Sequence, residues 1–294
     1  MKLTDNLRGA LWICLASAGA AGMSMGIKAV AQTGIDSWQI TFVRSLGSLC
    51  IVIPFILREG VGHLWTPKWH WHVLRGVLTA IAMLSGYHAI TQLPLATVTV
   101  LFFSTPLFVT GLAAVLLRED VGWRRWGATL VGFCGTIIVV RPSLEGVDPA
   151  MLFALLAAIC FAFGLIITKV LARTESPATM MMYVTGVSSV CTLPAGVSVW
   201  IWPDLPQCFM LLAVILCGTT RSYADIKGFA AGQASVVAPF TYLRVLFAAV
   251  GGFLLFAEVP DIYTYIGASV IIASTLYIAQ REARLGKKIT GGGP

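Results

Sequence analysis

The stretch GYHAITQLPLATVTVLFFSTPLFVTGLAAVLLRE, residues 86–119, returns in altered form as SYADIKGFAAGQASVVAPFTYLRVLFAAVGGFLLFAE, residues 222–258. Aligning the two copies pairs Tyr87 with Tyr223. Each copy reads as an apolar helix, a very short turn, a second apolar helix and a closing glutamate. A chain that repeats a unit of this kind is predicted to be a duplicated membrane protein.

The composition supports a membrane protein and argues against several other classes. Of 294 residues, 57% are hydrophobic and 11% are charged, whereas a soluble domain carries about 25% charged residues. The net charge of +7 comes from basic residues that sit singly at the ends of apolar segments, so it does not indicate a nucleic-acid partner. The seven cysteines lie inside apolar runs without metal-ligand spacing. We therefore expect no metal site and no cofactor.

A membrane span needs about 20 mostly apolar residues. By this measure the chain contains ten, at 9–31, 37–57, 73–92, 95–117, 123–140, 149–171, 178–202, 207–228, 233–256 and 261–280. The first run is too long for a cleaved leader and is expected to stay as a helix. The longest connection, 58–72, carries His70 and His72, and the basic tail 281–294 is expected to be disordered.

The placement of basic residues predicts the topology. Outside the spans, every Lys and Arg except Arg141 falls on the side of the N-terminus, so both termini are expected in the cytoplasm. Ten spans from two copies give five per copy, and an odd number makes the second copy enter the membrane from the opposite side. The predicted fold is an all-α integral membrane protein with two inverted five-helix repeats, residues 1–145 and 146–280. Such folds bind substrate between the repeats and alternate access around that site.

The repeated motifs also resemble a known family. The first copy carries Tyr87, LPLA at 93–96, PLF at 106–108, Glu119 and Gly127, and the second carries ASVVAPF at 234–240, Tyr242, Glu258 and GA at 267–268. This pattern is similar to the EamA-type transporters of the drug/metabolite transporter superfamily, over nearly the whole chain. The resemblance implies ten helices, inverted repeats, and a central cavity lined by helices 1, 3, 4, 6, 8 and 9. Members of that family carry chemically diverse substrates.

The chain departs from the resemblance at RSYADIK, residues 221–227, where the family usually has a plain apolar run. Arg221 and Asp225 are spaced i, i+4 and face the same side of a helix, close enough to pair. The pair is either structural, or Asp225 accepts a proton or a substrate amine during transport. Lys227 lies off that face and is expected to reach the headgroups.

Charges inside hydrocarbon are expensive, so each one requires a reason. Arg44, within the second span, is either a cation that holds a substrate carboxylate or phosphate, or a side chain that fixes neighbouring helix ends. Arg244 faces the cavity or pairs with a helix end. Lys28 and Lys169 close corresponding spans of the two repeats, and both are expected to snorkel to the membrane interface.

Uncharged groups complete the candidate site. His88, in the third span, either hydrogen-bonds a substrate and exchanges a proton, or is held by a neighbouring helix. Aromatic side chains in the central spans suit a planar or apolar part of a substrate. The predicted substrate-binding residues are Arg44, Tyr87, His88, Phe102, Tyr223, Asp225, Tyr242 and Arg244.

These observations predict a secondary transporter of the plasma (cell inner) membrane, monomeric or homodimeric, for a small polar metabolite. The excess of cations within the spans favours an amino acid or a related carboxylated compound. The alternatives are an exporter of drug-like or toxic compounds and a membrane enzyme acting on lipid-linked substrates. The sequence lacks a carboxylate pair, a nucleophile with its base, and a phosphate-binding GxxxxGK[ST] loop, which argues against an enzyme. Proton coupling, exchange and facilitated diffusion all remain open.

Overall fold

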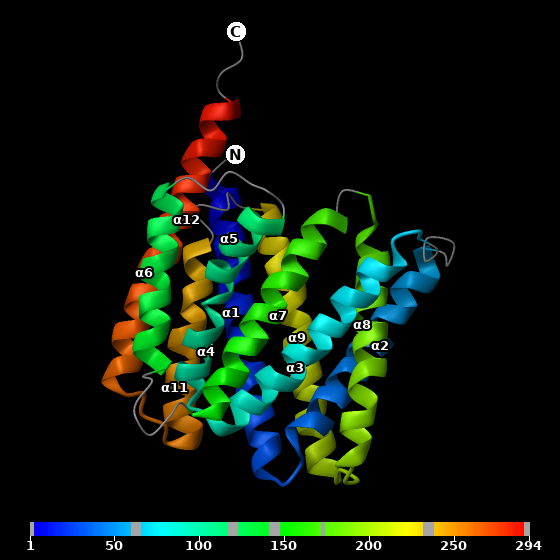
Figure 1. Ribbon diagram of the computed structural model, residues 1–294. Coiled ribbons are helices and arrows are strands. Elements are labelled where there is room, and N and C mark those ends of the chain that lie inside the picture. The colour runs from blue at the N-terminus through cyan, green and yellow to red at the C-terminus, as the bar shows by residue number, and fades with distance from the viewer. Residues whose placement is uncertain are drawn as a thin grey trace.

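The computed structural model describes residues 3–59, 66–116, 123–140, 148–171, 174–231 and 238–290. Within these ranges all regular structure is helical (Figure 1). The elements are α1 (Leu3–Gln32), α2 (Ser37–Glu59), α3 (Trp69–Gln92), α4 (Leu95–Phe102), α5 (Thr105–Leu116), α6 (Trp123–Val140), α7 (Pro149–Leu171), α8 (Pro177–Ser198), α9 (Leu205–Ala231), the 3₁₀ turn η2 (Ala238–Tyr242), α11 (Leu243–Phe256) and α12 (Ile262–Thr290).

Each predicted span overlaps one or two of these helices. Among the described residues, six segments are long and apolar enough to cross a membrane: Leu7–Gln32, Trp69–Gln92, Leu95–Leu116, Pro149–Thr168, Thr179–Ser198 and Leu205–Asp225. Three shorter apolar helices are Trp126–Val140, Phe240–Phe256 and Ile262–Ser274. The chain is therefore a helical, multi-pass membrane protein.

Two of the predicted spans are not regular α-helix throughout. The segment predicted as one helix at 95–117 breaks between α4 and α5. Pro106 lies in the first turn of α5, where its missing N–H removes a backbone bond across the break. In the second half, the 3₁₀ turn η2, which contains Pro239, leads into α11. The two halves are thus irregular at corresponding places.

The helices form one bundle, with α2 and α8 at one side and α6 and α12 at the other (Figure 1). Between these pairs, α1 packs along α9 and α3 packs along α7. In chain order, α1, α2, α3 and α5 of the first half correspond to α7, α8, α9 and α11 of the second. If each helix is replaced by its counterpart, the α1–α9 contact becomes the α7–α3 contact. Likewise α1–α11 becomes α7–α5, and α2–α9 becomes α8–α3, and all of these contacts occur.

Glycines allow two of these helix pairs to approach at the backbone. A Cβ at Gly19 of α1 would lie 3.1 Å from the Cys217 carbonyl oxygen of α9. A Cβ at Gly135 of α6 would lie 3.0 Å from the Gly267 carbonyl oxygen of α12. Small residues at such crossings are the usual means of close packing between membrane helices.

The structure corrects two expectations about where helices begin and end. Helix α3 begins at Trp69, and His72 is fully buried on it rather than lying in a loop. His72 stacks on Tyr183, with ring centroids 4.6 Å apart, and its Nε2 lies 3.4 Å from Glu175 Oε2. Helix α12 continues to Thr290, so residues 281–290 are helical rather than disordered. The strong helix formers Arg, Glu, Ala, Leu and Lys in that segment account for the extension.

Candidate functional site

Three arginines on different helices lie near one another inside the bundle. They are Arg44 on α2, Arg221 on α9 and Arg244 at the start of α11. Arg221 interacts electrostatically with Arg44, and Arg244 interacts with Arg221 and with Asp225. The Nε atom of each arginine is buried and has no hydrogen-bond partner within the described part of the chain. A buried donor atom without a hydrogen bond is costly unless something binds it.

Arg44 is held between α3 and α9. Its guanidinium carbon lies 5.8 Å from the Tyr87 ring centroid, and its Nη1 lies 3.6 Å from Met83 Sδ. Gly218 of α9 leaves the space that the guanidinium occupies, because a Cβ there would lie 3.0 Å from Nη2. The Tyr87 hydroxyl is buried and lies 3.8 Å from Met23 Sδ. The thioethers and the ring neutralise no charge, so the cation of Arg44 is available to an anion.

The predicted pairing of Arg221 with Asp225 is present but loose. Arg221 Nε lies 3.7 Å from Asp225 Oδ2, which is an ion pair without a hydrogen bond. Both side chains are about one-third exposed, at 33% and 29%. Because the cluster holds three guanidinium groups and the carboxylate of Asp225, which interacts with Arg221 and Arg244, it keeps an excess of positive charge.

The two interrupted segments meet next to this cluster. Helix α4 contacts α11, and the Phe103 and Tyr242 rings lie with centroids 5.0 Å apart. Phe103 is the residue at the α4–α5 break, and Tyr242 precedes α11. Phe102, one residue earlier, packs on α3, where a Cβ at Gly86 would lie 3.3 Å from its ring. Broken helices in corresponding positions of two halves typically mark the substrate site of a transporter.

Two of the predicted site residues face elsewhere. His88 follows Tyr87 on α3, so the two side chains point about 100° apart. The His88 ring meets Phe153 of α7 edge-on, with centroids 4.9 Å apart. The rings of Tyr223 and Trp12 meet edge-on, with centroids 5.9 Å apart. The Nζ atom of Lys227 lies 5.5 Å from the Tyr223 ring centroid. The structure therefore brings together Arg44, Tyr87, Asp225 and Arg244. Tyr242 contacts Phe103 at the break instead, and Phe102 lies at the margin.

The prediction that Lys28 snorkels to the interface is wrong. Its side chain is buried, donates to the Leu93 carbonyl oxygen at 2.7 Å, and forms a salt bridge with Glu258. Glu258 Oε2 also accepts from the Leu95 N–H at 2.8 Å. The partner of Lys28 comes from the other half of the chain, so its burial as a pair is cheaper than burial alone. The side chain of the corresponding Lys169 lies outside the described residues.

The reasoning from sequence also missed several groups around the cluster. Met23, Met83 and Gly218 shape the site, and none of them is charged or polar enough to stand out in a sequence. The spacing on α9 did contain a usable signal. Tyr223 and Asp225 are two residues apart, so they lie on opposite faces of a helix and do not share one site.

The sequence is similar to those of known transporters. A model of the EamA-like transporter family matches residues 7–141 and again residues 148–280. An S-adenosylmethionine uptake transporter of Rickettsia bellii is 35% identical over 87% of this chain and 89% of the relative. A riboflavin transporter of Vibrio cholerae is 29% identical over 96% of each chain. A pseudopaline exporter of Pseudomonas aeruginosa is 25% identical over 93% of this chain and 96% of the relative.

The fold has a counterpart among solved structures. One crystal structure of a protein superposes with a TM-score of 0.61, covering 97% of this chain and 99% of the other at 16% identity. At that identity the likeness concerns the fold alone.

Proposed function

The chain belongs to the EamA-like transporter family, and on that premise we propose that it carries an amino-acid-type metabolite by alternating access, with S-adenosylmethionine as the first candidate. The protein is a multi-pass transporter of the plasma membrane and not an enzyme. The observation that carries the proposal is the cationic cluster of Arg44, Arg221 and Arg244, whose Nε donors are buried and unused within the described chain.

The groups around the cluster match the chemistry of S-adenosylmethionine. Its carboxylate suits guanidinium donors, which bind carboxylates in a bidentate manner. Its ammonium and sulfonium charges suit Asp225 and the ring faces of Tyr87 and Tyr242, because aromatic faces attract cations. Its adenine ring is planar and suits the same aromatic surroundings. Riboflavin carries no carboxylate and gives the arginines no partner of opposite charge.

The symmetry of the helix contacts supports alternating access. The contacts α1–α9, α1–α11 and α2–α9 each have a counterpart after the exchange, and both halves depart from regular α-helix at corresponding places. We propose ten spans, five in residues 1–145 and five in 146–280, related by inversion, with both termini in the cytoplasm. Repeats of this kind expose the same site first to one side and then to the other.

Uptake into proteoliposomes tests the proposed substrate. The purified protein is reconstituted, and entry of radiolabelled S-adenosylmethionine is measured against unlabelled competitors. Decarboxylated S-adenosylmethionine lacks the carboxylate, and S-adenosylhomocysteine lacks the sulfonium charge. We expect S-adenosylmethionine itself to compete best, the decarboxylated analogue to compete at least tenfold more weakly, and riboflavin not to compete.

Matched variants connect the result to the cluster. Arg44→Gln is expected to abolish the discrimination against the decarboxylated analogue, and Arg44→Lys to retain part of it, because Lys keeps the charge but not the bidentate geometry. Lys288→Gln removes one charge from the far end of α12 and serves as the control. Equal competition by S-adenosylmethionine and its decarboxylated analogue in the parent protein would refute carboxylate recognition by the arginines.

The driving force is a separate question that the same vesicles answer. We propose that transport runs as exchange or facilitated diffusion, because Asp225 faces Arg221 and is the one carboxylate in the gathered cluster. Uptake should then be accelerated by substrate preloaded inside the vesicles and be unaffected by a pH gradient. Concentrative uptake on a pH gradient that Asp225→Asn eliminates would replace this proposal with proton coupling.

A further inference from the structure

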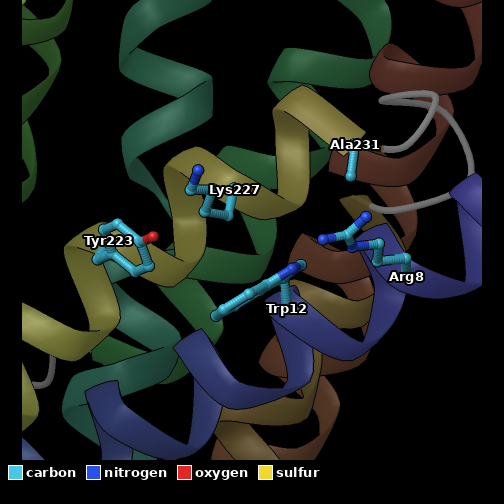
Figure 2. Close-up of a pocket in the computed structure, with 5 residues that line it drawn as sticks. All are labelled: Arg8, Trp12, Tyr223, Lys227 and Ala231. Atoms are coloured by element: carbon cyan, nitrogen blue, oxygen red, sulfur yellow. The ribbon is translucent and has the colours of Figure 1, made fainter.

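A second group of cations lines a pocket of about 300 Å³ between one end of α1 and one end of α9 (Figure 2). Arg8 and Trp12 come from α1, whereas Tyr223, Lys227 and Ala231 come from α9. The five lining residues include two cations and no carboxylate. Trp12 meets Tyr223 edge-on, and Lys227 lies over the Tyr223 ring. The pocket is therefore a small, open cationic site bordered by aromatic rings.

This pocket is separate from the arginine cluster. Arg221 and Asp225 form one i, i+4 pair on α9, and Tyr223 and Lys227 form another. Because the two pairs are offset by two residues, they lie on roughly opposite faces of the helix. Gly218, which contacts Arg44, lies on the face of Asp225. An anion bound between Arg8 and Lys227 would thus lie outside the transport site.

The surface around the pocket is apolar and faces away from the protein. On α1, Leu7, Leu11 and Leu15 flank Arg8 and are all exposed. On α9, an exposed stripe runs along one face of the helix at spacings of three, four and seven residues and ends in Tyr223, which is 54% exposed: Phe209, Leu212, Leu216 and Tyr223. Exposed apolar stripes on a membrane-spanning protein contact acyl chains. Cations at the end of such stripes lie where the headgroups begin.

We propose that this pocket binds an anionic phospholipid, whose headgroup phosphate lies between Arg8 and Lys227. One acyl chain would follow the stripe from Tyr223 to Phe209. Trp12 and Tyr223 would border the glycerol region, which is the depth that amphipathic aromatic residues prefer in membranes. Basic pockets between transmembrane helices are a recognised form of lipid-headgroup site. The charge of the lining selects an anion, and the adjoining stripe selects a lipid over a soluble phosphate.

Native mass spectrometry of the delipidated full-length protein in detergent tests this site. Phosphatidylglycerol is titrated against phosphatidylcholine of the same acyl chains, and the bound lipid per protein is counted. We expect phosphatidylglycerol to bind preferentially to the parent protein. Arg8→Gln/Lys227→Gln should weaken that binding by about thirty-fold, because each cation near a membrane surface contributes a few-fold to tenfold in affinity for an anionic lipid.

Two further variants and a soluble probe make each outcome decisive. Lys287→Gln/Lys288→Gln removes the same charge elsewhere and should bind like the parent. Arg8→Lys/Lys227→Arg keeps both charges and should retain the preference, which excludes a folding defect as the cause of the loss. Glycerol 3-phosphate, tested by protection against thermal unfolding, should have no effect. Equal binding by the Arg8→Gln/Lys227→Gln variant, or protection by glycerol 3-phosphate comparable to that by phosphatidylglycerol, would overturn the proposal.

Discussion

Single residues show most clearly how the two halves of the chain depend on each other. Lys28 belongs to α1 and Glu258 follows α11, and they are buried together against the backbone groups of Leu93 and Leu95. Neither residue predicts its partner from sequence, because the two are far apart in the chain and on different halves. The pairing avoids the high cost of burying either charge without its partner.

We predict that breaking this pair destabilises the protein more than removing it entirely. Lys28→Met leaves Glu258 buried without its cation, and such a loss costs about 3–5 kcal/mol in the free energy of unfolding. Lys28→Met/Glu258→Leu should restore part of that stability, since no unpaired charge remains. Thermal unfolding in detergent measures both variants. If the double variant were less stable than Lys28→Met, the unpaired charge of Glu258 would not be the cause of the destabilisation.

Gly218 offers a second test at this scale, because it makes room for Arg44. A methyl group at this position would lie 3.0 Å from Arg44 Nη2 and 3.1 Å from Met23 Sδ. Gly218→Ala should displace the guanidinium and lower S-adenosylmethionine uptake at least tenfold. Gly111→Ala is the control, since no atom of the described residues lies within 4 Å of its added Cβ, and it should gain about 0.5–1 kcal/mol of helix stability. Equal uptake by the two variants would contradict the assigned position of Arg44.

At the scale of elements, apolar runs predicted where helices lie but not how two of them are interrupted. The run 95–117 reads as one span, and the structure divides it at Phe103 and Ser104. The presence of Pro106 was visible in the sequence. Its effect was not visible, because a proline can either begin a new helix or lie in the interior of one and break it. The neighbouring ring of Tyr242 gives the break its place in the site.

We predict that closing this break impairs transport without unfolding the protein. In Pro106→Ala the new N–H can bond the Phe102 carbonyl, which now accepts from the Thr105 hydroxyl at 2.7 Å. A continuous helix would draw Phe103 away from Tyr242, so uptake should fall severalfold while the melting temperature stays equal or rises. Pro194→Ala changes a proline inside α8, which carries no predicted site residue, and should leave uptake unchanged. A Pro106→Ala protein with parental uptake would show that the break is dispensable.

At the scale of the whole molecule, the fold prediction rested mainly on the duplication within the sequence. The repeat of residues 86–119 at 222–258 indicated a duplicated helical membrane protein, and the EamA-like family match agrees with it. The inverted relationship stays a proposal, supported by helix contacts that exchange between halves. Contacts across the halves, such as Lys28 with Glu258, lay beyond the sequence because the repeat predicts which elements correspond, not which side chains meet.

The same pair predicts how the molecule opens. Lys28 and Glu258 join the two halves at the end of α1 remote from the N-terminus, and we infer that this end is the closed one in this conformation. Lys28→Met/Glu258→Leu removes the attraction that holds it closed and should shift the population toward the state open on that side. A cysteine at Ala96, which is 4% exposed, reports the opening through its rate of reaction with a membrane-impermeant maleimide, in a background without the native cysteines. We expect faster labelling in the double variant, and equal labelling of a cysteine at the exposed Gln92 in both backgrounds. An unchanged rate at position 96 would mean that the pair stabilises the fold without gating access.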